Sequence, residues 1–453
     1  MKQRFYIKLG IIFFLILFLL IPQSLIMDVV SERTTWRQQA YQSIEQSWPS
    51  AQTLAGPVLI VPYHLTYNQK EKVTENKKEI VKITEVTDHE FLYIIPKQLN
   101  IDSTLESSMR YRGIYQIPVY DNQLHVKGEF NNDALLKVIA ENKDKKIRWE
   151  KPQLSVLVTD QRGIAEPPSL TWNAEKIAFE PDANLPRTSA GMHTRLPELA
   201  TDKITALPFE FDLKLRGMRG MNFSLLSENT SIKLNANWAN PSFTGELLPE
   251  KRDINNEGFS AEWKASSFSY NVAGALDQCR KGECDVLLSR AVGFDLIQPV
   301  DVYQQSERSV KYAQLFILLT FMALILFELL KKLPIHPIQY TLVGMALLVF
   351  YLLLVSLSEH ILFLYAYIIG AVASISLLTF YFGAILKSSK LGSILGSALS
   401  VLYVVLYVIL QSEENALLMG SVLIFLMLAG LMTATRHFDW YALTESNKEE
   451  GMQ

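Results

Sequence analysis

Long apolar stretches near both ends of the chain constrain its fold most. The first, Leu9–Met27, reads LGIIFFLILFLLIPQSLIM and has about the 20 residues needed to cross a hydrocarbon core. Lys2, Arg4 and Lys8 precede it, so the positive-inside rule keeps its start in the cytoplasm. A cleaved signal peptide fits less well, because the stretch is long and no A-x-A-like site follows it. We therefore expect an uncleaved anchor.

A second apolar region follows residue 311 and divides into membrane-length segments. These are Tyr312–Leu330, Tyr340–Leu357, Ile361–Leu386, Leu391–Leu410 and Ala416–Ala434. Basic residues follow the first, third and last of them, namely Lys331 and Lys332, Lys387 and Lys390, and Arg436. The other two connections, SLSEH and QSEEN, are acidic and contain no Lys or Arg. This pattern predicts about six membrane helices, with both termini in the cytoplasm and one large exported insert.

The sequence thus predicts a multi-pass membrane protein with an N-terminal anchor helix, residues 1–27, and a C-terminal five-helix transmembrane bundle, residues 312–435. Residues 436–453 form a cytoplasmic tail. Residues 28–311 form the exported domain and are numerous enough to bury a core of their own. Gly and paired Pro at Asp160–Ser169 (DQRGIAEPPS) mark the place where this domain could divide in two.

Alternating hydrophobicity indicates that the exported domain is mainly β. FEFDLKLRG and SIKLNANW alternate apolar and polar residues with period two, as in antiparallel strands with one buried face. Long helices between the strands are absent from the pattern, which favours a sandwich-like fold over an α/β sheet. We expect a short helix only at Asp133–Glu141, and a helix over Asp28–Pro49 whose apolar stripe, Trp36, Ala40, Ile44 and Trp48, packs on the domain.

The two cysteines, Cys279 and Cys284, lie in the sequence CRKGEC. An exported domain folds in an oxidising compartment, where such a pair is expected to form a disulfide. A metal site would need further ligands, and no His lies nearby in the sequence. We therefore predict a disulfide that closes a short turn.

No motif for chemistry is recognisable. The chain lacks G-x-x-x-x-G-K-[ST], H-E-x-x-H, G-x-S-x-G and S-x-x-K. Asp88–Glu90 (DHE) offers three potential ligands, but neighbours in a strand point to opposite faces. A net charge of −3 argues against nucleic acid as a partner. We predict a protein that is not an enzyme, with no cofactor, no metal and no catalytic residues.

Polar residues at the ends of the membrane segments are interpreted as borders between lipid and water. Glu328 precedes Lys331 and Lys332 by one helical turn, a spacing that predicts a charge cluster at the membrane boundary. Glu359 and His360 occupy the short outer turn between two segments. They are candidates for interaction, specifically for docking the exported domain onto the helices; the alternative is that they face headgroups and water.

Small residues in LGSILGSALS predict close helix packing. Gly392 and Gly396 are four positions apart, a spacing that lets membrane helices approach closely. The neighbouring helix could belong to the same chain or to another copy, and the oligomeric state remains open.

Several stretches resemble the cell envelope integrity protein CreD family of Gram-negative inner membranes. They are RGIYQIPVY, GFSAEW, SWPSAQTLAGPVLIVPY, QPVDVYQQSERSVKYAQLFILLTF and HPIQYTLVG. The resemblance covers nearly the whole chain and implies an inner-membrane protein with a periplasmic domain. It also implies a role in envelope integrity, with links to two-component control of envelope stress, colicin tolerance and β-lactam response. It implies no catalytic residues.

Three functions remain open at this stage. The first is an envelope factor that sits in the lipid bilayer and binds periplasmic or membrane protein partners. The second is a transporter of a solute, which the lack of ionisable residues at the centres of the C-terminal segments disfavours. The third is an envelope-modifying enzyme whose site is assembled from residues distant in sequence.

Overall fold

The computed structural model describes residues 2–75, 78–201, 203–297, 302–331, 335–412 and 416–436. The chain divides into two compact units. One comprises Met1–Gln39 and Val300–Gln453, and the other Ala40–Pro299. These limits differ from the 27/28 and 311/312 boundaries expected from hydropathy, because helices continue beyond their apolar parts at both places. We call them the helical unit and the β-unit.

The N-terminal helix is assigned as α1 (Lys2–Phe18) and α2 (Leu20–Glu45). From Ile7 to Glu45 it runs for 39 residues and includes an apolar stretch able to cross a membrane. The helix is interrupted at Leu19, because Pro22 has no N–H to donate to the carbonyl of Phe18. The predicted anchor therefore extends directly into the helix expected after it.

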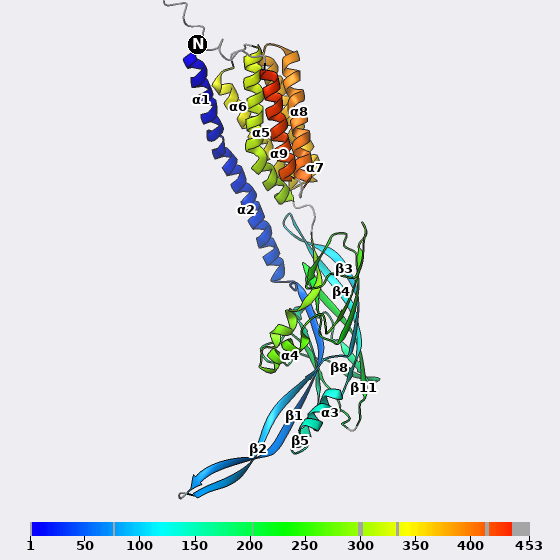
Figure 1. Ribbon diagram of the computed structural model, residues 1–453. Coiled ribbons are helices and arrows are strands. Elements are labelled where there is room, and N and C mark those ends of the chain that lie inside the picture. Colours follow the sequence, from blue (N-terminus) through cyan, green and yellow to red (C-terminus); the bar gives the residue numbers. More distant parts are fainter. Residues whose placement is uncertain are drawn as a thin grey trace, which may run out of the picture. The chain divides into compact units, whose positions relative to one another are not determined.

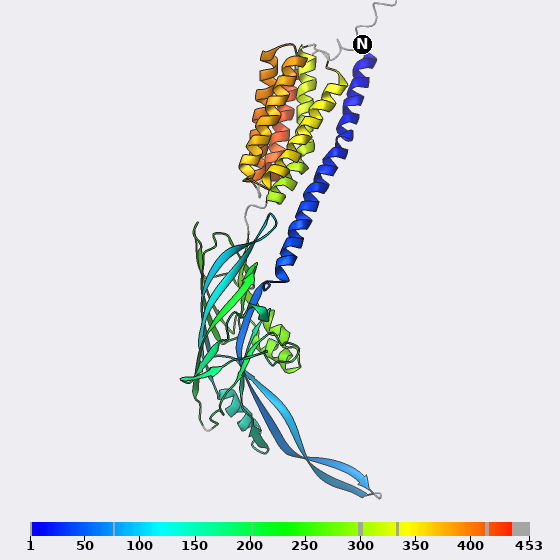
Figure 2. The same cartoon turned by 180° about the vertical axis from the view of Figure 1, so that it is seen from behind.

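The C-terminal helices lie side by side in both views (Figures 1 and 2). They are α5 (Val302–Lys331), α6 (Pro337–Ser358), α7 (Phe363–Ile385), α8 (Ser389–Gln411) and α9 (Ala416–Thr435). Within the described ranges, the N-terminal helix and α5–α8 are long and apolar enough to cross a membrane, whereas α9 supplies a shorter apolar stretch, Leu418–Gly430. The rings of Phe350, Tyr367 and Tyr403 contact one another in the core.

The β-unit consists of two sheets. In its described part the first has nine strands, with β14, β17, β12, β1, β6, β10 and β9 in that order and β2 and β5 also paired with β1. Their bounds are β1 Gln52–Glu75, β2 Lys78–Ile94, β5 Lys146–Trp149, β6 Gln153–Val158, β9 Glu180–Pro181, β10 Gly191–Arg195, β12 Gly220–Ser224, β14 Pro241–Gly245 and β17 Ala291–Leu296.

The second sheet has eight strands among the described residues, in the order β15, β16, β13, β3, β4, β11, β7 and β8. Their bounds are β3 Gln98–Arg112, β4 Tyr115–Asn131, β7 Ser169–Trp172, β8 Glu175–Ala178, β11 Ala206–Met218, β13 Asn229–Ala236, β15 Lys251–Ile254 and β16 Phe259–Ser266. Most pairs are antiparallel, but β1 pairs parallel with β12 and β13 with β3.

The predicted alternation builds the core of the β-unit. Phe209, Phe211, Leu213 and Leu215 of β11 are all buried, and side chains of both sheets form one continuous apolar cluster. This confirms the mainly-β, two-sheet domain predicted from the sequence. The physical reason is the period of two, which sends every second side chain to the same face.

Helices occupy a small part of the β-unit. α3 spans Asp133–Glu141, the residues predicted. The expectation that this helix would be the only one is wrong, because α4 (Val272–Arg280) and the 3₁₀ helices η1 (Gln161–Gly163) and η2 (Cys284–Leu288) are also present. Asn271 starts α4, since its side chain accepts a hydrogen bond from the N–H of Gly274.

The stripe predicted on a helix over Asp28–Pro49 divides at the boundary between the units, and because α2 ends at Glu45 its last member, Trp48, follows the helix. Ala40, Ile44 and Trp48 pack with Ile117, Val119 and Met218 of the β-unit. Trp36 lies in the helical unit, where the Arg33 guanidinium is 4.7 Å from its ring centroid. The sequence thus placed the packing face correctly for the last turns of the helix.

Candidate functional site

Glu328 joins the C-terminal helices to the N-terminal helix. It forms an ion pair with Lys8 of α1 and accepts a hydrogen bond of 2.9 Å from the hydroxyl of Tyr340. Lys8 also donates to the carbonyl of Ile335. We also expected Glu328 to pair with Lys331 and Lys332. Lys332 and the side chain of Lys331 lie outside the described part of the chain.

His336 and Pro337 begin α6 at the same end of the bundle. Pro337 is in the first turn, where its missing N–H costs no hydrogen bond. The backbone N–H of His336 donates to Gln339 Oε1 at 2.9 Å, and His336 Nδ1 accepts from the N–H of Ile338. These polar residues therefore act as a helix cap.

Glu359 makes a second connection to the N-terminal helix. Its Oε1 lies 3.3 Å from Arg33 Nε and accepts from the Tyr303 hydroxyl at 3.4 Å. The Glu359 side chain is only 8% exposed. His360 is exposed, and the described residues provide no partner for its side chain. All of these groups lie within the helical unit.

Gly392 and Gly396 face α7. A Cβ on Gly392 would meet the backbone of Gly383 at 2.7 Å, and one on Gly396 would collide with the side chain of Thr379. The predicted close approach thus occurs within the chain, between α7 and α8.

Cys279 and Cys284 are joined by a disulfide. It connects the last turn of α4 to the start of η2, and Gly282 between them has a φ of +92°, which favours glycine. The bond therefore closes a turn between two helices, and both cysteines are buried in the core of the β-unit. The two helices that the disulfide joins were not predicted from the sequence.

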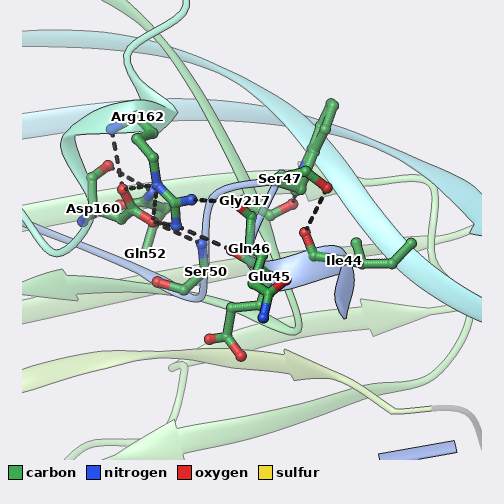
Figure 3. A network of polar contacts seen from close by, with 10 residues as sticks. Ile44, Glu45, Gln46, Ser47, Ser50, Gln52, Asp160, Arg162 and Gly217 are labelled. Carbon is green, nitrogen blue, oxygen red and sulfur yellow. Dashed lines mark hydrogen bonds and ion pairs between the residues drawn. The ribbon is translucent and has the colours of Figure 1, made fainter. Parts of the chain in front are cut away.

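A polar network holds the end of α2 in the β-unit (Figure 3). Arg162 donates to the backbone carbonyls of Glu45 and Gln46, both at 3.1 Å. It also pairs with Asp160 at 2.6 Å, and the N–H of Ser50 donates to that carboxylate at 3.1 Å. Chiefly because Arg162 donates to it, the pKa of Asp160 is lowered.

This network occupies the stretch considered as an internal boundary. Gln52 of β1 adds two hydrogen bonds to the backbone of Asp160, at 3.0 and 3.2 Å. The segment after β6 is thereby tied to the last turn of α2 and to the first residues of β1. It fixes the place where the chain enters the sheets.

A long hairpin extends away from the two sheets in both views (Figures 1 and 2). β1 and β2 pair continuously from Leu59 and Ile94 to Glu75 and Lys78, whereas β5 pairs with β1 only as far as Thr66. Residues 67–75 and 78–86 therefore form a two-stranded ribbon, which we call the arm. Among the described residues no third strand pairs with it.

The arm exposes apolar side chains on β2. Val81 and Ile83 are 52% and 60% exposed, and because they are two residues apart they lie on the same face. Both outer edges of a two-stranded ribbon carry unpaired backbone N–H and C=O groups. Sequence reasoning missed the arm, although the polar, Lys- and Glu-rich stretch between residues 68 and 85 is the signal that could have indicated it.

One group of potential metal ligands occurs in the described part of the chain, namely His64, His89 and Glu150 at the base of the arm. Asp88, His89 and Glu90 are consecutive in β2, so Asp88 and Glu90 project from the face opposite to that of His89. The central residue, His89, instead lies beside His64 of β1 and near Glu150, which follows β5. Sequence spacing gave no indication of this group, since its members are brought together only by strand pairing.

Comparisons with known proteins agree on one family. The family described as "Inner membrane protein CreD" matches residues 4–441. The chain is 32% identical over 446 residues to the Inner membrane protein CreD of Escherichia coli (strain K12), covering 98% of this chain and 95% of the relative.

Among solved structures, an M1 zinc metallopeptidase from Deinococcus radiodurans matches 38% of each chain with 8% identity and a TM-score of 0.17, a likeness too weak to inform fold or function. The sequence match, by contrast, extends over both units, from the N-terminal helix through the sheets to α9. This chain belongs to the CreD family of inner membrane proteins.

Proposed function

We propose that this protein supports the integrity of the cell envelope, with its β-unit in the periplasm and its arm bound to an envelope protein. The observation that carries the proposal is the arm. A two-stranded ribbon is marginally stable by itself in water, yet here it extends well beyond the sheet that supports its base.

The partner that best fits the arm is an extended segment of another polypeptide. An added strand would pair with the free backbone groups along an edge of the ribbon, as in β-strand addition. Val81 and Ile83 would then supply apolar contacts on one face. Lys82 and Glu85, both exposed, would favour a partner segment that carries charges of both signs.

The test replaces the apolar contacts in the full-length protein. We expect Val81→Lys with Ile83→Lys to abolish growth in the presence of a β-lactam in cells that depend on this chain, while the membrane level of the protein is unchanged. Ile254→Lys is the matched control, because Ile254 is 46% exposed on another edge strand, β15. The control should grow like wild type.

A photo-crosslinking residue at position 83 identifies what the arm contacts. We expect one envelope protein to be crosslinked from position 83 and not from position 254. A crosslinker at position 85 should capture the same protein, and the Val81→Lys, Ile83→Lys double substitution should prevent that capture. Normal growth of the double variant, or equal labelling from position 254, would show that the arm is not the binding surface.

A further inference from the structure

The base of the arm gathers two imidazoles and a carboxylate from three segments. His64 on β1 is paired directly across the ladder with His89 on β2, and Glu150 follows β5, which pairs with the other edge of β1. Residues directly opposite in a ladder project from the same face. The backbone N–H of Glu150 donates to the carbonyl of Pro62 at 2.9 Å, so pairing extends to Glu150 itself.

The side chains are close enough to share one ion. His64 Nε2 lies 2.6 Å from Glu150 Oε1, and the imidazoles of His64 and His89 stack with ring centroids 4.7 Å apart. One ligand atom from each of the three residues lies within 4.8 Å of the other two. Ligand atoms bonded to one zinc ion at about 2.0–2.2 Å are at most about 4.4 Å apart, so small side-chain rotations suffice.

We propose that His64, His89 and Glu150 bind a divalent transition-metal ion of the zinc class. Two imidazoles and one carboxylate suit zinc, copper or nickel, whereas calcium and magnesium prefer oxygen ligands alone. Three protein ligands leave a fourth position for water or for a group of another molecule. Because His89 is exposed, this position faces solvent.

Surrounding residues restrict how the ion is bound. Phe91 packs edge-on against His89, with ring centroids 4.9 Å apart, and limits the orientations of that imidazole. Arg148 lies opposite His64 in the ladder and is exposed, so its charge can remain in water. The ion would replace the hydrogen bond between His64 Nε2 and Glu150 Oε1 and would lie between the two groups.

The consequence of the site is mechanical. His64 and His89 belong to the two strands of the arm, and Glu150 follows β5, beyond which the arm has no third strand. An ion bound to all three would fix the arm to β5 at the point where it leaves the sheet. This inference does not depend on the identity of any arm partner.

The test is zinc binding by the full-length protein, purified in detergent with a tag that contains no His and stripped with a chelator. Titration against a fluorescent zinc indicator should show one zinc ion per chain for the wild type. His89→Ala should weaken binding by more than about tenfold, since even the loss of a group that only orients a ligand typically costs 10–100-fold. His89 is exposed, so this substitution preserves the fold.

His125→Ala is the matched control. His125 also contacts two carboxylates, but through opposite ring nitrogens, with Nδ1 2.8 Å from Asp212 and Nε2 3.2 Å from Glu210. One ion binds only one nitrogen of an imidazole, and each nitrogen of His125 faces a different carboxylate. His125, Asp212 and Glu210 therefore cannot all bind the same ion. Removal of the His125 imidazole should leave zinc affinity at the wild-type value. Absence of zinc binding by the wild type, or an equal loss in the two variants, would overturn the proposal.

Cobalt provides a second readout. Co²⁺ in place of zinc should give visible absorption bands typical of nitrogen and oxygen ligation in the wild type, and His89→Ala should change their intensity and position. A spectrum identical in the wild type and in His89→Ala would also overturn the proposal, whatever the stability of the variant.

Discussion

Lys8 and Glu328 form an ion pair although they are 320 positions apart in the sequence. Each side chain is about one-fifth exposed, at 20% and 19%, and Glu328 also accepts from Tyr340. Glu359 and Arg33 form a second such pair. The N-terminal helix is thus held to the C-terminal helices by charges as well as by apolar packing.

Removing Glu328 should therefore loosen the N-terminal helix. We expect Glu328→Gln to lower the free energy of unfolding by about 1.5–3 kcal/mol, the usual contribution of a hydrogen bond to a charged group. Thermal unfolding of the protein in detergent measures it. Lys8→Gln together with Glu328→Gln should cost less than the sum of the single changes, because the two residues interact. Strict additivity would show that the pair contributes nothing.

Glu359 and His360 should behave differently. Glu359→Ala removes the acceptor of Arg33 and Tyr303 and should lower the melting temperature, whereas His360→Ala should not, because its side chain is exposed. Both variants should insert normally into the membrane. If His360→Ala causes an equal loss and the β-unit of both variants becomes protease-sensitive, the docking role predicted from the sequence would be favoured instead.

The network at the end of α2 predicts an acid-dependent stability. Arg162 holds the pKa of Asp160 below its ordinary value, so the unfolded chain binds this proton more readily than the folded one. The stabilisation is complete above the unfolded pKa, about 3.9, and is lost as the pH falls through the lower folded value.

Unfolding of the full-length protein by denaturant at pH 7 and pH 3 tests this. Asp160→Asn should destabilise the protein at pH 7 and should reduce the loss between pH 7 and pH 3. Asp253→Asn, on the exposed strand β15, is the control and should follow the wild type at both pH values. A wild-type pH profile in Asp160→Asn would contradict the role given to this carboxylate.

Gly392→Ala should separate α7 and α8. The added Cβ meets backbone atoms of Gly383 at 2.7 Å, which cannot rotate away, and overpacking of this kind costs about 1–3 kcal/mol. Gly396→Ala should cost less, because the side chain of Thr379 can turn. Gly430→Ala in α9, where a Cβ meets nothing within 4 Å, should be neutral or stabilising. Melting temperatures in detergent rank the three.

Reporter fusions test the orientation on which the proposed function depends. We expect fusions after Gln38, Glu359 and Glu413 to report the periplasm. Fusions after Lys332, Lys390 and Arg436 should report the cytoplasm, because basic residues flank this second set. A single reversed site would require a different number of spans.

The sequence by itself determined the long apolar helices of this protein and the class of each unit. Leu9–Met27 and the apolar segments between Tyr312 and Leu410 are long enough to cross a bilayer whatever they pack against. The alternation in β11 and the residues of α3 are likewise local properties, so a one-dimensional pattern was sufficient to predict them. The family followed from motifs that needed no structure.

Only the tertiary structure decided which of these elements meet. The contacting groups are far apart in the sequence: Lys8 and Glu328, His64 and Glu150, and Arg162 and the end of α2. Hydrophobic periodicity indicates which face of an element is buried, but not which neighbour buries it. The same holds for the arm: its polar composition is visible in the sequence, but its lack of a third strand follows from β5 ending its pairing at Thr66. Pairing partners in a sheet are chosen by the packing of the whole core, which no local stretch of the chain encodes.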